Sequence, residues 1–343
     1  MPLAEMLERI SGRLTNELFM ARMRSLVPHI VRDVTNDGHE AAANWRLRRI
    51  QRTLTGIAVM HLGPPTDAPV AILMLPQTAA GVRLLRRHAS AIAQLHADEA
   101  SAPIAHLVPR VIRQGEIQRQ YYLLMEALPG ESAIGMLSEP AHRATMLRDA
   151  AELISGLHRR SRRPLTIDLL TSVEWIDRPA QTINALLDPR HREELRLPLE
   201  RLRDELHESL ASRNLFVGWI HGDFWPGNLL VDRVGAITGI VDWDRADRSQ
   251  PPFHDLLHLV LYTRKLLRNV EPGEVIRDAL LDPAWTNPEQ RVLESLGADG
   301  MGERPMLLLY WLRFIAASLD QSLYFARNRR WIQMNIDEVL RGI

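Results

Sequence analysis

The feature that most constrains the fold is a short polar segment followed by two apolar runs that can pair with each other. Residues 218–244 read GWIHGDFWPGNLLVDRVGAITGIVDWD. The two runs are Leu229–Asp232 and Ile237–Val241. A turn around Gly235 separates them, and this pattern predicts a β-hairpin. Asn228 and Asp242 are equally far from Gly235, so antiparallel pairing should place them side by side just beyond the strand ends.

The polar residues around this hairpin suit phosphoryl transfer. Asn228 and Asp242 offer two oxygen ligands to one hard cation such as Mg2+, and Asp223 places a carboxylate on the preceding loop. A single Asp in a Pro-Gly loop is more often a turn former than a base. The combination of residue types, spacing and hairpin symmetry favours the functional interpretation over the turn.

The first part of the chain mixes strand and helix patterns. Helical spacing of apolar residues runs from Leu3 to about Val34, and a second helix is expected at Ala79–Ala97. Five strand-like runs surround that second helix: Leu47–Arg52, Gly56–Leu62, Val70–Leu75, Val108–Ile112 and Tyr121–Glu126. This order predicts a small antiparallel sheet with one helix, an α+β layer.

Beyond Pro129-Gly130 the patterns are mainly helical, apart from the hairpin. We therefore place a hinge at Glu126–Gly130. The prediction is an α+β fold of two lobes. Residues 1–125 form the N-terminal lobe, with a helical extension over residues 1–45, and residues 126–343 form a helical C-terminal lobe that carries the polar segment.

Charge and residue usage argue against several classes of function. Lys+Arg and Asp+Glu each total 42, so there is no basic excess for binding nucleic acid. The lack of cysteine excludes disulfides, thiolate zinc sites and Cys nucleophiles. The charged N-terminus does not fit a signal peptide, and the longest apolar run, Met306–Leu319, is too short for a membrane span. We expect a soluble cytoplasmic protein without a membrane partner; its oligomeric state is open.

The polar segment resembles a known enzyme family. His221, Asp223 and Asn228 have the H-x-D-x-x-x-x-N spacing of a kinase catalytic loop. Together with the Val-Asp-Trp-Asp that ends the hairpin, they are similar to the signature of the aminoglycoside phosphotransferase and choline kinase family. Weaker likeness to its hinge, its Leu-His helix and its GDPxxDLA segment occurs at Tyr122–Gly130, Leu157-His158 and Pro251–Leu257. The resemblance spans about Ala68 to Leu261.

This resemblance implies a protein-kinase-like fold and transfer of the γ-phosphoryl group of ATP, with GTP possible, to a hydroxyl group. Asp223 would be the catalytic base, and Asn228 and Asp242 would bind Mg. The hinge backbone would receive adenine, at Met125, Glu126 and Leu128. The family's second acidic position falls on Asp244, which we rank lower because an acidic residue after a strand is usually solvated.

Two residues of the similar segments, His221 and Asp255, are expected to support the catalytic loop. His221 should hold the catalytic loop by packing and hydrogen bonding, since its counterpart in the family is not the proton acceptor. Asp255 should accept hydrogen bonds from backbone N–H groups near that loop.

One part of a kinase-like site is missing. Such folds carry a lysine on the third strand that clamps the nucleotide phosphates, and a helix glutamate that pairs with it. Leu73 or Met74, depending on register, occupies the lysine position, and the helix Ala79–Ala97 contains no glutamate. The only lysine of the chain, Lys265, lies far along the second lobe. Arginines that could contact phosphate instead are Arg52, Arg86 and Arg87.

Other classes of function remain open. His254 and His258 have the i, i+4 spacing of HExxH zinc ligands, which would fit a zinc hydrolase, although no third ligand is obvious. The missing lysine would fit a pseudokinase or scaffold. The acceptor could be a sugar, an antibiotic, another small hydroxylated metabolite, or a Ser/Thr side chain of a biosynthetic peptide. A polycationic aminoglycoside would need an acidic pocket, whereas the second lobe has mixed charges.

Overall fold

The computed structural model describes residues 3–53, 56–65, 68–294, 301–321 and 323–342. The chain folds as two compact units. Unit 1 comprises residues 1–94 and 109–128, and unit 2 comprises residues 95–108 and 129–343. Of the helices in the described ranges, none has the length and apolar character needed to cross a membrane.

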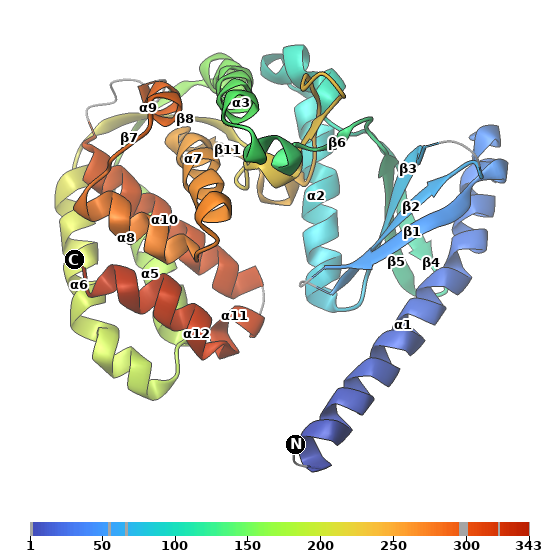
Figure 1. The fold of residues 1–343 in the computed structure, drawn as a ribbon, viewed down its shortest axis with the longest axis horizontal. Helices are drawn as coiled ribbons and strands as arrows, with labels where there is room; N and C mark the ends of the chain where they lie inside the picture. The colour runs from blue at the N-terminus through green and yellow to red at the C-terminus, as the bar shows by residue number, and fades with distance from the viewer. Residues whose placement is uncertain (1–2, 54–55, 66–67, 295–300, 322, 343) are drawn as a thin grey trace. The chain divides into compact units, whose positions relative to one another are not determined.

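Unit 1 is built on a five-stranded antiparallel sheet in the order β1-β2-β3-β5-β4. The strands are β1 (Arg46–Arg52), β2 (Ile57–Gly63), β3 (Ala71–Pro76), β4 (Val111–Ile117) and β5 (Gln120–Glu126). Helices α1 (Leu3–Asn36) and α2 (Ala79–Ala97) lie on opposite faces of this sheet (Figure 1). The predicted strand at 108–112 is wrong by several residues, because the apolar run ends at Ile112, whereas the edge strand β4 continues through Arg113, Gln114 and Glu116.

The two faces of the sheet are distinguished by strand pairing. Leu73 pairs with Met60 and Leu124, and all three are buried in one core with α1. Met74 pairs with Leu123, so it lies on the other face, which α2 covers. Leu73 is the poorer candidate for the position of the missing lysine, because its side chain is fully buried in the core with α1. Met74 is therefore the better candidate.

Unit 2 is mainly helical. Its longer helices are α3 (Pro140–Ser161), α5 (Arg178–Leu186), α6 (Pro189–Leu210), α7 (Phe253–Arg268), α8 (Pro272–Leu281), α9 (Asn287–Glu294) and α10 (Glu303–Gln321). Its shorter ones are α4 (Leu169–Ser172), α11 (Leu323–Arg327), α12 (Arg329–Ile332) and α13 (Glu338–Leu340). Additional helical turns are Glu99–Leu107, Ala133–Ser138, Val173–Asp177, Pro226–Asn228, Trp243–Arg245 and Gln333–Asp337; in unit 1 there is one at Glu40–Asn44.

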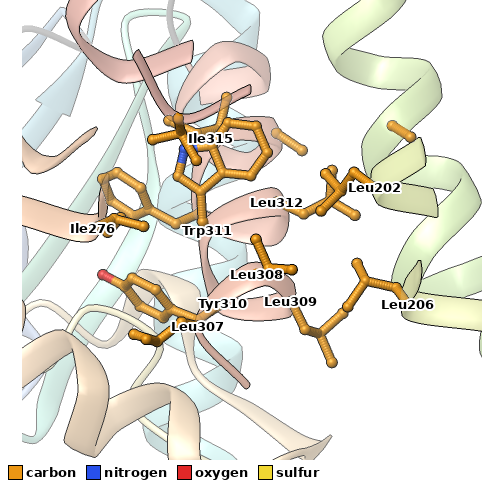
Figure 2. Close-up of a cluster of buried hydrophobic side chains, with 14 of the residues drawn as sticks. Leu202, Leu206, Ile276, Leu307, Leu308, Leu309, Tyr310, Trp311, Leu312 and Ile315 are labelled. Carbon is orange, nitrogen blue, oxygen red and sulfur yellow. The ribbon is translucent and has the colours of Figure 1, made fainter. Parts of the chain in front are cut away.

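Helix α10 runs through the core of unit 2. Figure 2 shows Leu309 and Leu312 of α10 pointing toward Leu206 and Leu202 of α6, whereas Tyr310 points away from α6. All of them are almost completely buried. The apolar run Met306–Leu319, which sequence analysis judged too short for a membrane span, is therefore part of a core helix. The hydroxyl group of Tyr310 lies on the side of α10 away from α6.

Two small sheets complete unit 2, with strand orders β10-β9-β6 and β11-β8-β7. Their strands are β6 (Glu131–Ser132), β7 (Arg163–Thr166), β8 (Asn214–Ile220), β9 (Leu229–Val231), β10 (Ile237–Ile240) and β11 (Asp247–Gln250). Sequence analysis predicted only the β9-β10 hairpin. The sheet around β8 matters most, because β8 leads directly into His221. The predicted α+β class is confirmed.

The segment Leu95–Val108 belongs to unit 2, although the predicted boundary grouped it with the first lobe. Two polar contacts show why. Trp219 Nε1 donates to Asp98 Oδ2 at 2.8 Å, and Arg160 Nε donates to the Ala100 carbonyl at 2.8 Å. The segment is thus fixed to β8 and α3, and this could not be read from local periodicity.

Candidate active site

The loop after β8 is held by one buried carboxylate. Asp255, near the start of α7, is completely buried and accepts hydrogen bonds from the backbone N–H groups of His221 and Gly222, both at 2.8 Å. His158 Nε2 of α3 lies 3.0 Å from the same carboxylate. Burial alone would raise the pKa of Asp255, but hydrogen bonding to His158 and the nearby histidines outweigh it and lower the pKa. These contacts agree with the supporting role expected for Asp255.

His221 is fully buried and fixed by its own hydrogen bonds. Its Nδ1 accepts from the Asp223 N–H at 3.2 Å, so Nε2 carries the proton and donates to the Val241 carbonyl at 2.9 Å. Its ring packs 4.5 Å from that of Trp243. Burial lowers its pKa, which keeps the ring neutral. His221 therefore ties the loop to the end of β10.

Gly222 is required at its position by geometry. Its φ of +81° lies in the left-handed region, and an added Cβ would be 2.4 Å from the Arg245 carbonyl oxygen. This close approach brings the loop that carries Asp223 against the segment that follows Asp242.

Asp223 uses both carboxylate oxygens. Oδ2 accepts hydrogen bonds from Asn228 Nδ2 at 2.9 Å and Trp225 Nε1 at 3.2 Å. Oδ1 lies 3.1 Å from His258 Nε2 and 4.0 Å from Arg245 Nη1. Burial favours the neutral acid, but His258 and the charge of Arg245 outweigh it and hold the pKa of Asp223 well below its usual range. The carboxylate is therefore ionised at neutral pH.

His258 was assigned to the wrong kind of site in the zinc hypothesis. Its Nδ1 lies 2.7 Å from the Tyr310 hydroxyl, while Nε2 faces Asp223. If Tyr310 donates to Nδ1, Nε2 carries the proton; this nitrogen is close to the carboxylate but not in regular hydrogen-bond geometry with it. The partner histidine, His254, lies 3.3 Å from the Gly222 carbonyl through Nε2. Within the described residues there is no group of three or more His, Cys, Asp or Glu side chains that could hold a metal ion.

Asn228 and Asp242 lie at the two ends of the hairpin, but the predicted register is wrong by one residue. Leu229 pairs with Ile240, and the Val241 N–H donates to the Asn228 carbonyl at 2.9 Å. The turn is centred on Val234 and not on Gly235, since the Asp232 N–H donates to the Ala236 carbonyl, and this alone would shift the pairing by two residues. An extra residue between Ile237 and Gly239 in β10 reduces the shift to one. Asp242 is therefore the next residue beyond the partner of Asn228.

The side chains of these two residues suit a hard cation. Asn228 Nδ2 donates to both the carbonyl and Oδ2 of Asp223 at 2.9 Å, which fixes the amide and leaves its Oδ1 available as a ligand atom. Asp242 has a left-handed φ of +66° and is exposed to solvent. The pKa of Asp242 is raised to about 6, first because nearby protein atoms desolvate the carboxyl group and second because Asp223 is negatively charged. A bound cation would relieve that repulsion.

Sequence analysis ranked Asp244 below Asp242 and did not consider Arg245. Asp244 is buried, not solvated as expected, and lies 3.4 Å from Gln321 Nε2. Arg245 also hydrogen-bonds to Gln321, through Nη2, and reaches toward Asp223. The signal in the sequence was the charged run Asp242 to Arg245, but local spacing does not tell which of its side chains turns inward.

The nucleotide residues predicted in unit 1 are placed as follows. Met125 is buried in β5, the Glu126 N–H donates to the Arg110 carbonyl at 2.9 Å, and the Ala127 N–H donates to the Val70 carbonyl at 3.0 Å. These bonds fix the segment that leads to Leu128. Among the turn and loop hydrogen bonds of the described residues, none uses the Leu128 N–H.

Arg52 lies at the opposite end of the sheet, and its side chain points to the α1 face. It hydrogen-bonds to Gln77 and lies over the ring of Phe19, 5.5 Å from its centroid. Arg86 of α2 instead lies 5.3 Å from the ring centroid of Tyr121, on the face that carries Met74. Of these two arginines, Arg86 is thus the one that shares a face with the position of the missing lysine.

Comparison with known proteins identifies the family. A sequence model of the phosphotransferase enzyme family matches residues 65–289, which is more than half of the chain. The chain therefore belongs to the phosphotransferase enzyme family, and the resemblance recognised in its polar segment is confirmed. It is a phosphotransferase by class. No curated protein sequence matches the chain.

The chain is also similar to several solved structures. An aminoglycoside-3'-phosphotransferase of type VIII is 23% identical, with 85% of this chain and 99% of that chain covered and a TM-score of 0.48. An aminoglycoside phosphotransferase from Streptomyces rimosus is 21% identical, with coverages of 82% and 96% and a TM-score of 0.46. A glucosamine kinase in complex with glucosamine, ADP and inorganic phosphate is 18% identical, with coverages of 85% and 92% and a TM-score of 0.40.

Proposed function

We propose that the protein is an ATP-dependent phosphotransferase that transfers the γ-phosphoryl group to a hydroxyl of a small molecule, with GTP as a possible alternative donor. Family membership supports phosphoryl transfer. The observation that carries the proposal is the contact between Asn228 and Asp223, which orients an ionised carboxylate and an amide oxygen beside Asp242.

In this proposal Asp223 orients the acceptor hydroxyl and takes up its proton. The carboxylate is kept charged by His258 and Arg245, and hydrogen bonds from Asn228 and Trp225 fix its direction. A base held in this way need not reorganise when the hydroxyl arrives.

Asn228 and Asp242 would hold Mg2+ through oxygen atoms, the ligand type that this ion prefers. When bound, the ion supplies positive charge to the phosphates. The pKa of Asp242 is raised first by desolvation and second by the negative charge of Asp223, and such an ion would offset the second effect. His221 holds this end of the hairpin to the catalytic loop through the Val241 carbonyl.

The register of the sheet suits a nucleotide lying along the strands of unit 1. Glu126 pairs with Ala71, which pairs with Leu62, whereas Arg52 pairs with Ala58. Four residues of β2 separate the two ends, roughly 14 Å at 3.4 Å per residue. We propose adenine at the hinge backbone near Glu126 and Leu128. The phosphates would then lie toward the β1-β2 turn, with Arg86 as the candidate for the missing cation.

The experiment is transfer to a panel of sugars, antibiotics, small hydroxylated metabolites and Ser/Thr peptides by wild type and Asp223→Asn. Loss of a general base should lower the rate about 10²–10⁴-fold while nucleotide binding persists. Asp204→Asn, an exposed carboxylate on α6, is the matched control. Wild-type turnover in Asp223→Asn would refute the base. A wild type that binds no Mg-nucleotide would instead support the pseudokinase reading that the missing lysine suggests.

A further inference from the structure

One face of α7 continues from the catalytic loop toward the end of the helix. Asp255, His258, Tyr262 and Lys265 follow one another at spacings of three, four and three residues, which puts them on a single helix face. Asp255 binds the loop backbone and His258 faces Asp223. Tyr262 and Lys265 therefore extend the face that already meets the catalytic carboxylate.

An aromatic side chain of the catalytic loop, Trp225, packs against this face of α7. The indole of Trp225 donates to Asp223, and its ring centroid lies 5.4 Å from that of Tyr262. Gly227 makes room for the indole, since an added Cβ would be 2.3 Å from a ring atom of Trp225. Tyr262 is in turn stacked 4.3 Å from His258. Both Trp225 and Tyr262 keep partial exposure, so they form an apolar wall beside the carboxylate.

The only lysine of the 343 residues ends this face. Lys265 Nζ lies 5.8 Å from the centroid of the Tyr262 ring, and the residue is half-buried. The neighbouring arginines on α7 form ion pairs, Arg264 with Glu289 and Arg268 with Asp278. Within the described part of the chain, Lys265 forms no ion pair. A lysine on a helix surface is often merely solvated, but this one leans over the aromatic wall.

We propose that Trp225, Tyr262 and Lys265 form the acceptor subsite, and that it takes a hydroxylated ring compound carrying a carboxylate or phosphate. The ring face would pack on the aromatic wall and the anion would meet Lys265. Seven residues of helix separate His258 from Lys265, so the anion would lie on the order of 10 Å from the reacting hydroxyl. The inference rests on the proposed role of Asp223. It disfavours polycationic aminoglycosides, whose ammonium groups Lys265 repels.

The test measures binding and transfer separately. With Mg2+ and a non-hydrolysable ATP analogue present, calorimetry compares trehalose, trehalose 6-phosphate, an aldobiouronic acid and kanamycin. Wild type should bind at least one anionic probe about tenfold or more tightly than trehalose, and the two anionic arms tell phosphate from carboxylate. Lys265→Glu should abolish that preference and Lys265→Arg should keep it. Arg268→Glu, a charge reversal on the same helix that breaks the pair with Asp278, should leave it unchanged.

Equal binding of neutral and anionic probes, tighter binding of kanamycin, or an unchanged preference in Lys265→Glu would overturn the subsite. The binding result does not depend on turnover. If the anionic preference is found but Asp223→Asn keeps full transfer, the base assignment fails while the subsite stands. If Asp223→Asn loses transfer but Lys265→Glu changes nothing, the base assignment stands and the subsite fails.

Discussion

Asp255→Asn should destabilise the fold strongly, although Asp255 does no chemistry in this account. The carboxylate is fully buried and receives three donors, two backbone N–H groups and His158. Asn keeps one acceptor oxygen and turns an NH2 group toward a donor. One charge-assisted bond, about 1.5–3 kcal/mol, is lost and a buried donor is left unpaired, about 1–3 kcal/mol more. We expect a loss of about 3–5 kcal/mol in the free energy of unfolding.

Urea unfolding of wild type and Asp255→Asn across pH is the assay. The pKa of Asp255 is lowered in the fold, so its stabilisation is present above the ordinary value near 4 and is lost as pH falls through the folded pKa. The difference between the two proteins should be full at pH 7 and should shrink in acid. Asp204→Asn should stay within about 0.5 kcal/mol of wild type. A comparably small change in Asp255→Asn would refute the reasoning.

Three further changes test the loop, the nucleotide face and the carboxylate contact. Gly222→Ala should unfold at a lower urea concentration than Gly235→Ala. Both glycines have positive φ, but the new Cβ at Gly222 would lie 2.4 Å from a backbone atom, whereas at Gly235 it would meet a flexible side chain. Equal midpoints would contradict this. Met74→Lys should tighten ATP in calorimetry, whereas Leu73→Lys should chiefly destabilise the fold because it buries a charge in the α1 core. His258→Phe should lower kcat about tenfold or more with nucleotide affinity kept, since it removes the imidazole nitrogen that lies 3.1 Å from the catalytic carboxylate. Unchanged kcat would show that the contact is only structural.

Much of the fold was predictable because its elements carry their own periodicity. The helix Ala79–Ala97 has the predicted bounds, since its apolar face repeats over five turns. The sheet of unit 2 was missed for three separate reasons. In β8 a continuous apolar run has no alternation, β11 is wholly polar, and β7 is an edge strand with Pro164. Pairing with β8, and not the local sequence, makes strands of β7 and β11.

The site was predictable where residues are close in sequence and not where they meet in space. His221, Asp223, Asn228 and Asp242 lie together in the structure, with a register error of one residue because the hairpin turn is centred on Val234 and not on Gly235. The approach of His258 to the carboxylate depends on the packing of α7, and its spacing alone suggested a zinc ligand. Contacts between separate elements leave no periodic signal along the chain.

The central claim is a Mg2+-dependent nucleotide site at Asn228 and Asp242. Its most direct test is the melting shift caused by ATP with and without Mg2+, in wild type and Asp242→Ala, each relative to its own ligand-free Tm. This reference removes the strain of Ala at a φ of +66°. Wild type at about a hundred times the Kd should gain roughly 2.7 kcal/mol, and Asp242→Ala should lose the Mg2+-dependent part. Asp282→Ala, an exposed acid at the end of α8, should behave as wild type. Equal Mg-ATP shifts in wild type and Asp242→Ala would contradict the account.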